Sequence, residues 1–373
     1  MENSTGYESS SGNYTTAAPE LTTSLLKARP HLTGFILFLY VAIFLIGVLG
    51  NGLVLFVVAK FKSMQTITNR FIACLSISDL LICLFAIPFT PINALMTSWI
   101  FGKVLCRLVP IILVLSVFVS SLTSVVIALD RYMVIVHPHT PRMTENTQIG
   151  IIISIWLLAA SAAIPIGIYT TLDEWNGAIT CQEKWPSTNA PIIYTWMVFS
   201  LQLVIPAIII TVCYTRVSIQ LARRSRKRVG SRDYYREKAE VQRNHKINRM
   251  LIAMIAIFIL CWLPLGLFHL VMKILPPDYQ IIVFLFVHVI AMSSVIYNPF
   301  LYGWMNENFN KHFRQLGSGC AKVCCPKREP LVEKETTMPS ALRTAQTNGH
   351  TKSGCELNSS ATSVEEVEPL MEK

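Results

Sequence analysis

The chain has 373 residues, of which 52% are hydrophobic and only 14% are charged, and its mean hydropathy is +0.48. A soluble globular domain has roughly a quarter of its residues charged, so this composition excludes a soluble protein and indicates a membrane protein. The formal net charge of +10 comes largely from residues 216–249, which hold twelve Lys and Arg against three acids.

Seven apolar runs follow one another along the chain. Each is about 20 residues or longer, enough to cross roughly 30 Å of hydrocarbon as an α-helix. Helices are expected because backbone polar groups must be satisfied inside the bilayer. The runs are residues 35–59, 71–96, 108–129, 149–169, 191–215, 251–272 and 281–304. We therefore predict an all-α membrane protein with a seven-transmembrane helix bundle over residues 34–305.

The polar segments on either side of the spans predict their orientation. Residues 1–33 are Ser- and Thr-rich and are predicted to be a disordered tail. Residues 216–249 join the fifth and sixth runs, and loops rich in Lys and Arg stay in the cytoplasm. We expect a multi-pass plasma-membrane protein with an extracellular N-terminus and a cytoplasmic C-terminus. Asn3 and Asn13 each begin a glycosylation triplet on the outer tail. Orientation already explains the basic segment, so no nucleic-acid partner is expected.

Asp79 is the one acid in the middle of an apolar run. An ionisable side chain at that depth is costly and marks a functional site by default. The polar residues Ser120, Ser294 and Asn298 of the third and seventh runs can converge on it. Oxygen ligands around a carboxylate suit a hard cation, so we expect a pocket for allosteric Na⁺ and no other cofactor. The alternative is a structural aspartate held by hydrogen bonds.

Two of the ten cysteines, Cys106 and Cys181, fall in predicted extracellular segments. Disulfides form in the oxidising exterior and are rare in the cytosol. We therefore expect a bridge that ties the outer end of the third span to the loop after the fourth.

An acid and a base stand side by side at the end of the third run, where Asp130 precedes Arg131 and Tyr132. Charges are costly in hydrocarbon, so we expect this pair at the membrane edge, bonded together and poised for release. Seven spans with such a switch at one face describe a receptor better than an enzyme or a pore. No HExxH, GxSxG, Walker or CxxC pattern stands where chemistry can use it, so an enzyme is not expected.

Prolines inside the runs are candidate hinges, because each removes a backbone hydrogen bond and can kink its helix. Trp262 lies two residues before Pro264, so its ring can move with the bend. A plain core aromatic residue is the alternative. The prolines are Pro88, Pro165, Pro206, Pro264 and Pro299.

Residues 306–317 are predicted to form an amphipathic helix on the inner membrane surface, in contact with lipid. Phe309, Phe313 and Leu316 occupy one side, whereas Lys311, His312 and Arg314 occupy the other. Three cysteines follow, which are candidate palmitoylation sites or else ordinary reduced thiols: Cys320, Cys324 and Cys325. Residues 318–373 are polar and form a predicted disordered tail, with a serine cluster from Ser359 to Ser363 that is a candidate for phosphorylation.

These motifs, one or more in each span, resemble those of rhodopsin-like G-protein-coupled receptors. They are Gly50-Asn51, Leu75 to Leu80, Cys106, Asp130-Arg131-Tyr132, Trp156, Pro206, Tyr214, Cys261 to Pro264, and Asn298 to Tyr302. Within that family the chain is most similar to receptors of the neuropeptide Y and short neuropeptide F type. The segments that carry this similarity are Met64 to Asn69, Ile87 to Pro91, Trp99 to Gly102, His137-Pro138, Pro141 to Met143, Cys181 to Pro186, Ala291 to Ser294, and Trp304 to Phe309.

The resemblance implies roles for residues on the inner half of the bundle. Asp130 would hold Arg131 in the inactive state, and Arg131 would contact a heterotrimeric G protein once the sixth span swings out. The coupling switch comprises Asp130, Arg131, Tyr132, Tyr214, Asn298, Pro299 and Tyr302. The toggle beneath the ligand comprises Phe258, Trp262 and Pro264. The sodium pocket comprises Asp79, Ser120, Ser294 and Asn298.

The resemblance also implies a ligand and partners. The ligand would be an extracellular neuropeptide with an amidated Arg-Phe or Arg-Tyr ending, and the G protein would belong to the inhibitory class. Receptor kinases and arrestin would act through the cytoplasmic tail. The expected ligand site comprises Phe89, Leu113, Val114, Glu183, Gln202, Trp262, His269, Lys273 and Met292.

The chain departs from its relatives at several of these positions. Leu113-Val114 stands where they usually carry Gln-Gly, Lys273 where they often carry an acid, and Gly266 where Asn is common. Asn244 replaces an acid that pairs with the switch arginine in many relatives, which predicts higher basal activity. An arginine of the peptide would then need another acid: Glu183, Asp173, Glu174 or Asp278.

Two alternatives remain for the function. Lys273 and the apolar Leu113-Val114 pair favour the same receptor fold with an acidic peptide or a lipid as ligand. A seven-helix transporter or channel is more remote, because such proteins carry several charges along a pathway. Asp79 stands nearly alone within the spans.

Overall fold

The computed structural model describes residues 30–324, apart from residues 97, 176, 227–233 and 273–274. Asn3, Asn13, Lys273, Cys325 and the tail beyond lie outside the described residues. The same holds for the side chains of Cys320, Cys324 and Asp278.

Seven segments of the described chain are helical, long and apolar enough to cross a membrane, which confirms the predicted all-α bundle. The first, third, fourth and sixth spans are the single helices α2 (Pro30–Lys60), α5 (Gly102–Val136), α6 (Glu145–Tyr169) and α9 (Tyr234–Val271). The second span is built from α3 (Ile67–Leu81), η2 (Ile82–Ala86) and α4 (Ile87–Leu95). The fifth is built from α7 (Ala190–Phe199), η3 (Ser200–Val204) and α8 (Ile205–Arg226), and the seventh from α10 (Pro277–Met292) and α11 (Ser294–Met305).

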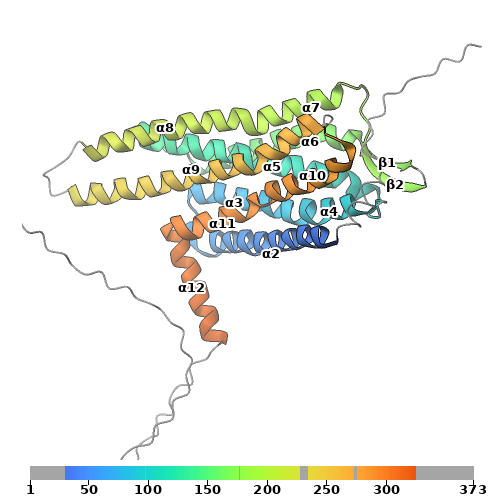
Figure 1. The fold of residues 1–373 in the computed structure, drawn as a ribbon. Helices are drawn as coiled ribbons and strands as arrows, with labels where there is room; N and C mark the ends of the chain where they lie inside the picture. The colour runs from blue at the N-terminus through green and yellow to red at the C-terminus, as the bar shows by residue number, and fades with distance from the viewer. Residues whose placement is uncertain (1–29, 97, 176, 227–233, 273–274, 325–373) are drawn as a thin grey trace, which may run out of the picture. The chain divides into compact units, whose positions relative to one another are not determined.

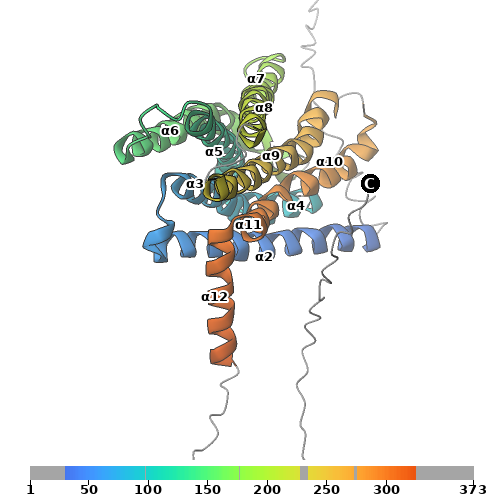
Figure 2. The ribbon, with the colours of Figure 1, turned by 90° about the vertical axis from the view of Figure 1, so that its left-hand side faces the viewer.

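The spans lie side by side along their length, and α5 packs against α3, α6 and α8 (Figures 1 and 2). Large apolar side chains also cover the outer surface: Leu49, Leu157 and Leu260 are each about two-thirds exposed or more. Lipid tails are as apolar as these side chains, so a surface of this kind suits the bilayer.

Two spans contain a π-helical turn that the sequence analysis did not predict, namely η2 and η3. A π turn replaces the usual i→i−4 pairing and so changes which carbonyls are free to accept other donors. In η3, the carbonyl oxygen of Gln202 accepts a hydrogen bond of 2.7 Å from the Ser121 hydroxyl on α5. The turn thereby links the third and fifth spans.

The loop after the fourth span is a β-hairpin, which the sequence analysis also did not predict. Strands β1 (Thr170–Trp175) and β2 (Ala178–Glu183) pair antiparallel, and Leu172 lies opposite Cys181. Gly177 in the turn has a φ of 78°, a conformation that glycine adopts readily. Cys181 forms a disulfide with Cys106, with Cα atoms 5.7 Å apart, which confirms the predicted bridge.

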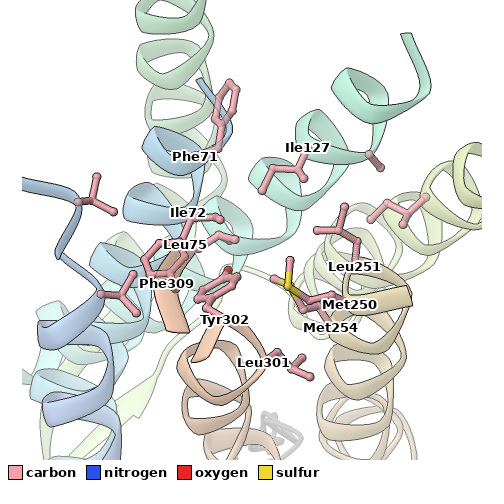
Figure 3. Close-up of a cluster of buried hydrophobic side chains, with 14 of the residues drawn as sticks. Phe71, Ile72, Leu75, Ile127, Met250, Leu251, Met254, Leu301, Tyr302 and Phe309 are labelled. Atoms are coloured by element: carbon pink, nitrogen blue, oxygen red, sulfur yellow. The ribbon is translucent and has the colours of Figure 1, made fainter. Parts of the chain in front are cut away.

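The inner half of the bundle has an apolar core to which α2, α3, α5, α8, α9, α11 and α12 (Glu307–Cys324) contribute. Figure 3 shows side chains of α3, α5, α9, α11 and α12 that point toward one another. Phe309 of α12 is fully buried there, with its ring 5.6 Å from that of Tyr302. The helix extends to Cys324, beyond the predicted boundary at residue 317, and its first turns pack on the bundle through an aromatic anchor.

Candidate functional site

Asp130 and Arg131 at the inner end of α5 are bonded to each other. Arg131 donates to Asp130 from Nη2 over 2.6 Å and from Nε over 3.1 Å. The same Nη2 also donates to the Thr68 hydroxyl at the start of α3. The side chains are 21% and 10% exposed, so the pair is partly desolvated and its attraction is stronger than at an open surface.

Within the described residues, the hydrogen bonds and ion pairs of Arg131 go to Asp130 and Thr68, and none reaches α9. Asn244 is half-buried near the inner end of α9. The sixth span is therefore joined to the third by apolar packing there and not by an ion pair.

Two of the predicted switch tyrosines are buried in the inner core, and the third packs against its edge. Tyr214 and Tyr302 are buried in the inner core shown in part in Figure 3, and the Tyr302 hydroxyl has no hydrogen-bond partner among the described residues. Tyr132 instead shares a hydrogen bond of 3.3 Å with the exposed His137. A buried hydroxyl without a partner is costly. An arrangement of the inner helices that gives the Tyr302 hydroxyl a hydrogen-bond partner would therefore be favoured at this residue.

The predicted polar pocket around Asp79 is present as a small internal cavity. Asp79 is 3% exposed, and Asn298 donates from Nδ2 to its Oδ2 over 2.9 Å. Ser120 and Ser294 line the same cavity, so all four residues expected there are brought together. Ser120 also shares a hydrogen bond of 2.8 Å with Ser78.

The cavity has room for one small species. It offers about 20 Å³ to the centre of a water-sized particle, and one water needs roughly 10–15 Å³ on that measure. Its polar lining consists of a carboxylate, an amide and hydroxyls, including that of Ser124, which the sequence analysis missed. Oxygen atoms of this kind are the ligands that hard cations take.

The predicted toggle residues border this cavity. Phe258 and Trp262 both line it, with their rings 6.1 Å apart. The indole Nε1 of Trp262 donates to the Ser294 hydroxyl over 3.2 Å. A bend of α9 near Pro264 would therefore move Trp262, which also lines the polar cavity.

The residues predicted to bind ligand pack in different parts of the bundle. Leu113 packs against the apolar cluster that contains Trp262 and Met292, whereas Val114 packs against a different cluster that includes residues of α6. Met292 is fully buried, so it is not exposed to a ligand in this conformation.

The other predicted ligand residues lie at different places around the outer half. Phe89 packs edge-on against Phe101 with ring centroids 5.0 Å apart, and His269 is exposed. Gln202 is half-buried, with a side-chain oxygen that has no partner among the described residues. Sequence reasoning missed the buried bond of 2.8 Å between Tyr40 and His288, which lie on spans that are distant in sequence.

Gly266 is explained by its neighbour. A Cβ atom placed on Gly266 would lie 2.4 Å from the ring of Phe199 on α7. That is closer than real Cβ contacts, so the Phe199 side chain or the backbone would have to shift. Phe199 therefore occupies the space that a larger residue at this position would need, and the sixth span lies close against the fifth.

The hairpin presents one acid in an aromatic setting. Trp185 donates from Nε1 to Glu183 Oε2 over 2.7 Å, and its ring lies 4.6 Å from Tyr169 and 5.1 Å from Tyr194. Part of the Glu183 surface is exposed, yet desolvation by the surrounding residues raises the pKa of its carboxyl. The hydrogen bond from Trp185 partly offsets this rise.

The other hairpin acids differ from Glu183. Asp173 is paired with Lys184 over 2.8 Å and accepts a hydrogen bond from Gln182. Glu174 is exposed near the turn, and its side chain makes no hydrogen bond or ion pair among the described residues. Glu183 is thus the hairpin acid that combines access with aromatic neighbours, which favour a cation.

Comparison with known proteins agrees with this arrangement. Residues 50–302 match the sequence profile of the 7 transmembrane receptor (rhodopsin family). The chain is 35% identical to neuropeptide Y receptor type 2 of Mus musculus over 332 residues, which cover 84% of each protein. It is 32% identical to neuropeptide Y receptor type 6 of Mus musculus, over 85% of this chain and 88% of that receptor. Identity to neuropeptide Y receptor type 2 of Homo sapiens is 37% over 74% of each protein.

Proposed function

The chain belongs to the rhodopsin family of seven-transmembrane receptors, and from this we propose that it is a plasma-membrane receptor for an extracellular neuropeptide related to neuropeptide Y. Binding of the peptide would activate a heterotrimeric G protein. Neuropeptide Y receptors are among the relatives that cover most of the chain. That observation carries the proposal, and the inhibitory class of G protein is proposed from the same similarity.

The proposed orientation places the β-hairpin outside the cell and α12 inside. The disulfide ties the hairpin to α5, and oxidised cysteines suit the exterior. The Arg131 clamp lies at the opposite end of α5, on the side of the basic segment 216–249. This orientation would also place Asn3 and Asn13 where glycosylation occurs.

We propose that activation opens the clamp on Arg131. Asp130 and Thr68 hold the guanidinium in the described conformation. A ligand can shift the equilibrium only by binding the open form better than the closed form. A hundredfold shift of the population ratio requires about 2.7 kcal/mol of differential binding.

The proposed peptide carries an arginine near its amidated end, and Glu183 is its proposed partner. A guanidinium forms strong charge-assisted hydrogen bonds with a carboxylate and stacks on aromatic rings. Trp185 and Tyr169 supply such rings beside Glu183. Asp173 is less suited because Lys184 already neutralises it.

We also propose that the cavity beside Asp79 holds Na⁺. Asp79, Ser120, Ser294 and Asn298 would hold the ion through their oxygens, and the ion would compensate the buried carboxylate charge. Because Trp262 lines the same cavity, an ion there would favour the packing of the described conformation.

A ligand screen in transfected cells tests the peptide proposal. G-protein activation is measured with peptides amidated after Arg-Phe or Arg-Tyr, with acidic peptides and with lipids. We expect a response to the amidated peptides that Glu183→Gln weakens and the neighbouring Glu174→Gln preserves. A response only to acidic peptides or lipids would overturn the proposed ligand class while leaving the receptor fold intact.

A further inference from the structure

An open groove of about 660 Å³ lies at the inner end of the bundle, bordered by α9, the end of α11 and α12. Glu307, Lys311 and Arg314 line it from α12, at positions i, i+4 and i+7, which share one face of a helix. Lys246 of α9 and Trp304 of α11 line the groove from the bundle. Figure 2 views the molecule from this end, with α12 leaving the bundle beside α11.

Positive charge exceeds negative charge in the groove. Lys246 pairs with Glu307 over 3.1 Å, which links the sixth span to α12. Lys311 and Arg314 are exposed and form no ion pair with the described part of the chain. The three cations and one acid leave two positive charges without a protein counter-charge.

The groove also has a marker of the membrane interface. Trp304 is 78% exposed and borders the cations. Tryptophan is enriched at the level of lipid headgroups, where one part of its ring meets hydrocarbon and the other meets water. The opposite face of α12 is anchored in the bundle by Phe309, so the charged face is left for another partner.

We propose that this groove binds the phosphorylated headgroup of an anionic lipid of the inner leaflet, with phosphoinositides as the fitting class. Arg314 would contact a phosphate through two N–H groups, and Lys311 and Lys246 would add point charges. Basic pockets between spans on the cytoplasmic side bind headgroups of this class. The inference rests on the proposed orientation of the receptor.

Glu307 has a specific part in this proposal. It holds Lys246 in the absence of lipid, so a lipid phosphate competes with the Glu307 carboxylate for that ammonium group. Removal of the Glu307 charge should therefore strengthen lipid binding, whereas removal of Lys311 and Arg314 should weaken it.

Binding is measured with the purified full-length receptor in detergent micelles, titrated with fluorescent phosphatidylinositol bisphosphate. Unlabelled phosphatidylinositol bisphosphate, phosphatidylcholine and soluble inositol phosphates serve as competitors. We expect Lys311→Gln/Arg314→Gln to weaken binding about tenfold or more. The double variant Lys62→Gln/Arg142→Gln removes two exposed inner-face charges away from the groove, and we expect its affinity to stay within about twofold. Glu307→Gln should bind more tightly than the parent.

Equal losses in the two double variants would overturn the site, because they would show only diffuse attraction to basic surface. Competition by phosphatidylcholine as strong as that by unlabelled phosphoinositide would overturn it too, as would stronger binding of soluble inositol phosphate than of the lipid. A large gain after phosphatase treatment of the receptor would assign the groove to the phosphorylated tail instead. The assay contains no peptide and no G protein, so a failure here is separate from a failure of the proposed receptor function.

Discussion

Asn298 of the seventh span donates a hydrogen bond of 2.9 Å to Asp79 of the second, joining residues 219 positions apart in sequence. Asp79 is the only acid among the buried residues of the described chain. The bond satisfies one carboxylate oxygen, and hydroxyls of Ser120 and Ser294 line the space beside it. Helices that are distant in sequence thus share one polar cavity inside the bundle.

We predict that Asp79→Asn removes the effect of Na⁺ on ligand affinity. The neutral amide keeps the size of the carboxylate but loses the charge that attracts the ion. Peptide affinity is measured in sodium chloride and in an equal concentration of N-methylglucamine chloride. The parent should bind agonist peptide more weakly in sodium, and Asp79→Asn should bind equally in both salts. A parent that shows no difference between the salts would argue against the ion.

We predict that Asn244→Glu lowers basal signalling. No ion pair of the described residues joins Arg131 to α9, and an acid at Asn244 would supply an attraction that favours the closed form. Partly exposed pairs contribute about 0.2–1 kcal/mol, so basal G-protein activation should fall up to about fivefold. Asn244→Gln is the matched neutral control. The same fall in both variants would show that charge is not the cause.

Gly266→Ala should destabilise the receptor. Its methyl group would meet the Phe199 ring at 2.4 Å, and such overpacking costs about 1–3 kcal/mol. Gly52→Ala is the control, because no atom lies within 4 Å of a Cβ there and alanine is the better helix former. Thermal unfolding of purified receptor should show a lower midpoint for Gly266→Ala and an equal or higher one for Gly52→Ala. The reverse order would contradict this account of the close approach.

Loss of the disulfide should free the hairpin from α5. Cys106→Ser/Cys181→Ser is expected to lower the free energy of unfolding by about 2–5 kcal/mol. It should also reduce peptide affinity, because Glu183 is the last residue of β2 and lies two residues after the bonded Cys181. Cys213→Ala, which removes a buried free thiol, is the control. Peptide binding and thermal unfolding are measured together. Unchanged affinity in the double variant would remove Glu183 from the ligand site.

Much of the bundle follows from hydropathy, but the ends of its helices do not. The third run was predicted over residues 108–129, whereas α5 extends from Gly102 to Val136. The sixth was predicted to begin at residue 251, whereas α9 begins at Tyr234. Hydropathy detects the part of a helix that crosses hydrocarbon, and both helices continue beyond it through segments that contain charged residues. The hairpin and the two π turns leave no mark in hydropathy, because they change backbone pairing and not composition.

The polar cavity around Asp79 was predictable, whereas the packing of the predicted ligand residues was not. A lone carboxylate in the middle of a span needs polar neighbours, and few polar residues lie at that depth. The prediction that Asn298 lies beside Asp79 is confirmed. Leu113 and Val114 face different clusters, and Met292 is buried. A span that is apolar on all sides carries no amphipathic signal, so its sequence does not tell which residues face a cavity.

The central claim is tested most directly by nucleotide exchange on a purified heterotrimeric G protein, with the purified full-length receptor and amidated peptides ending in Arg-Phe or Arg-Tyr. The account predicts that such a peptide accelerates exchange by the parent and by Arg142→Ala, an inner-face control. Arg131→Ala should abolish the acceleration while still binding the peptide. Acceleration that survives in Arg131→Ala, or a parent that no amidated Arg-Phe or Arg-Tyr peptide activates, would contradict it.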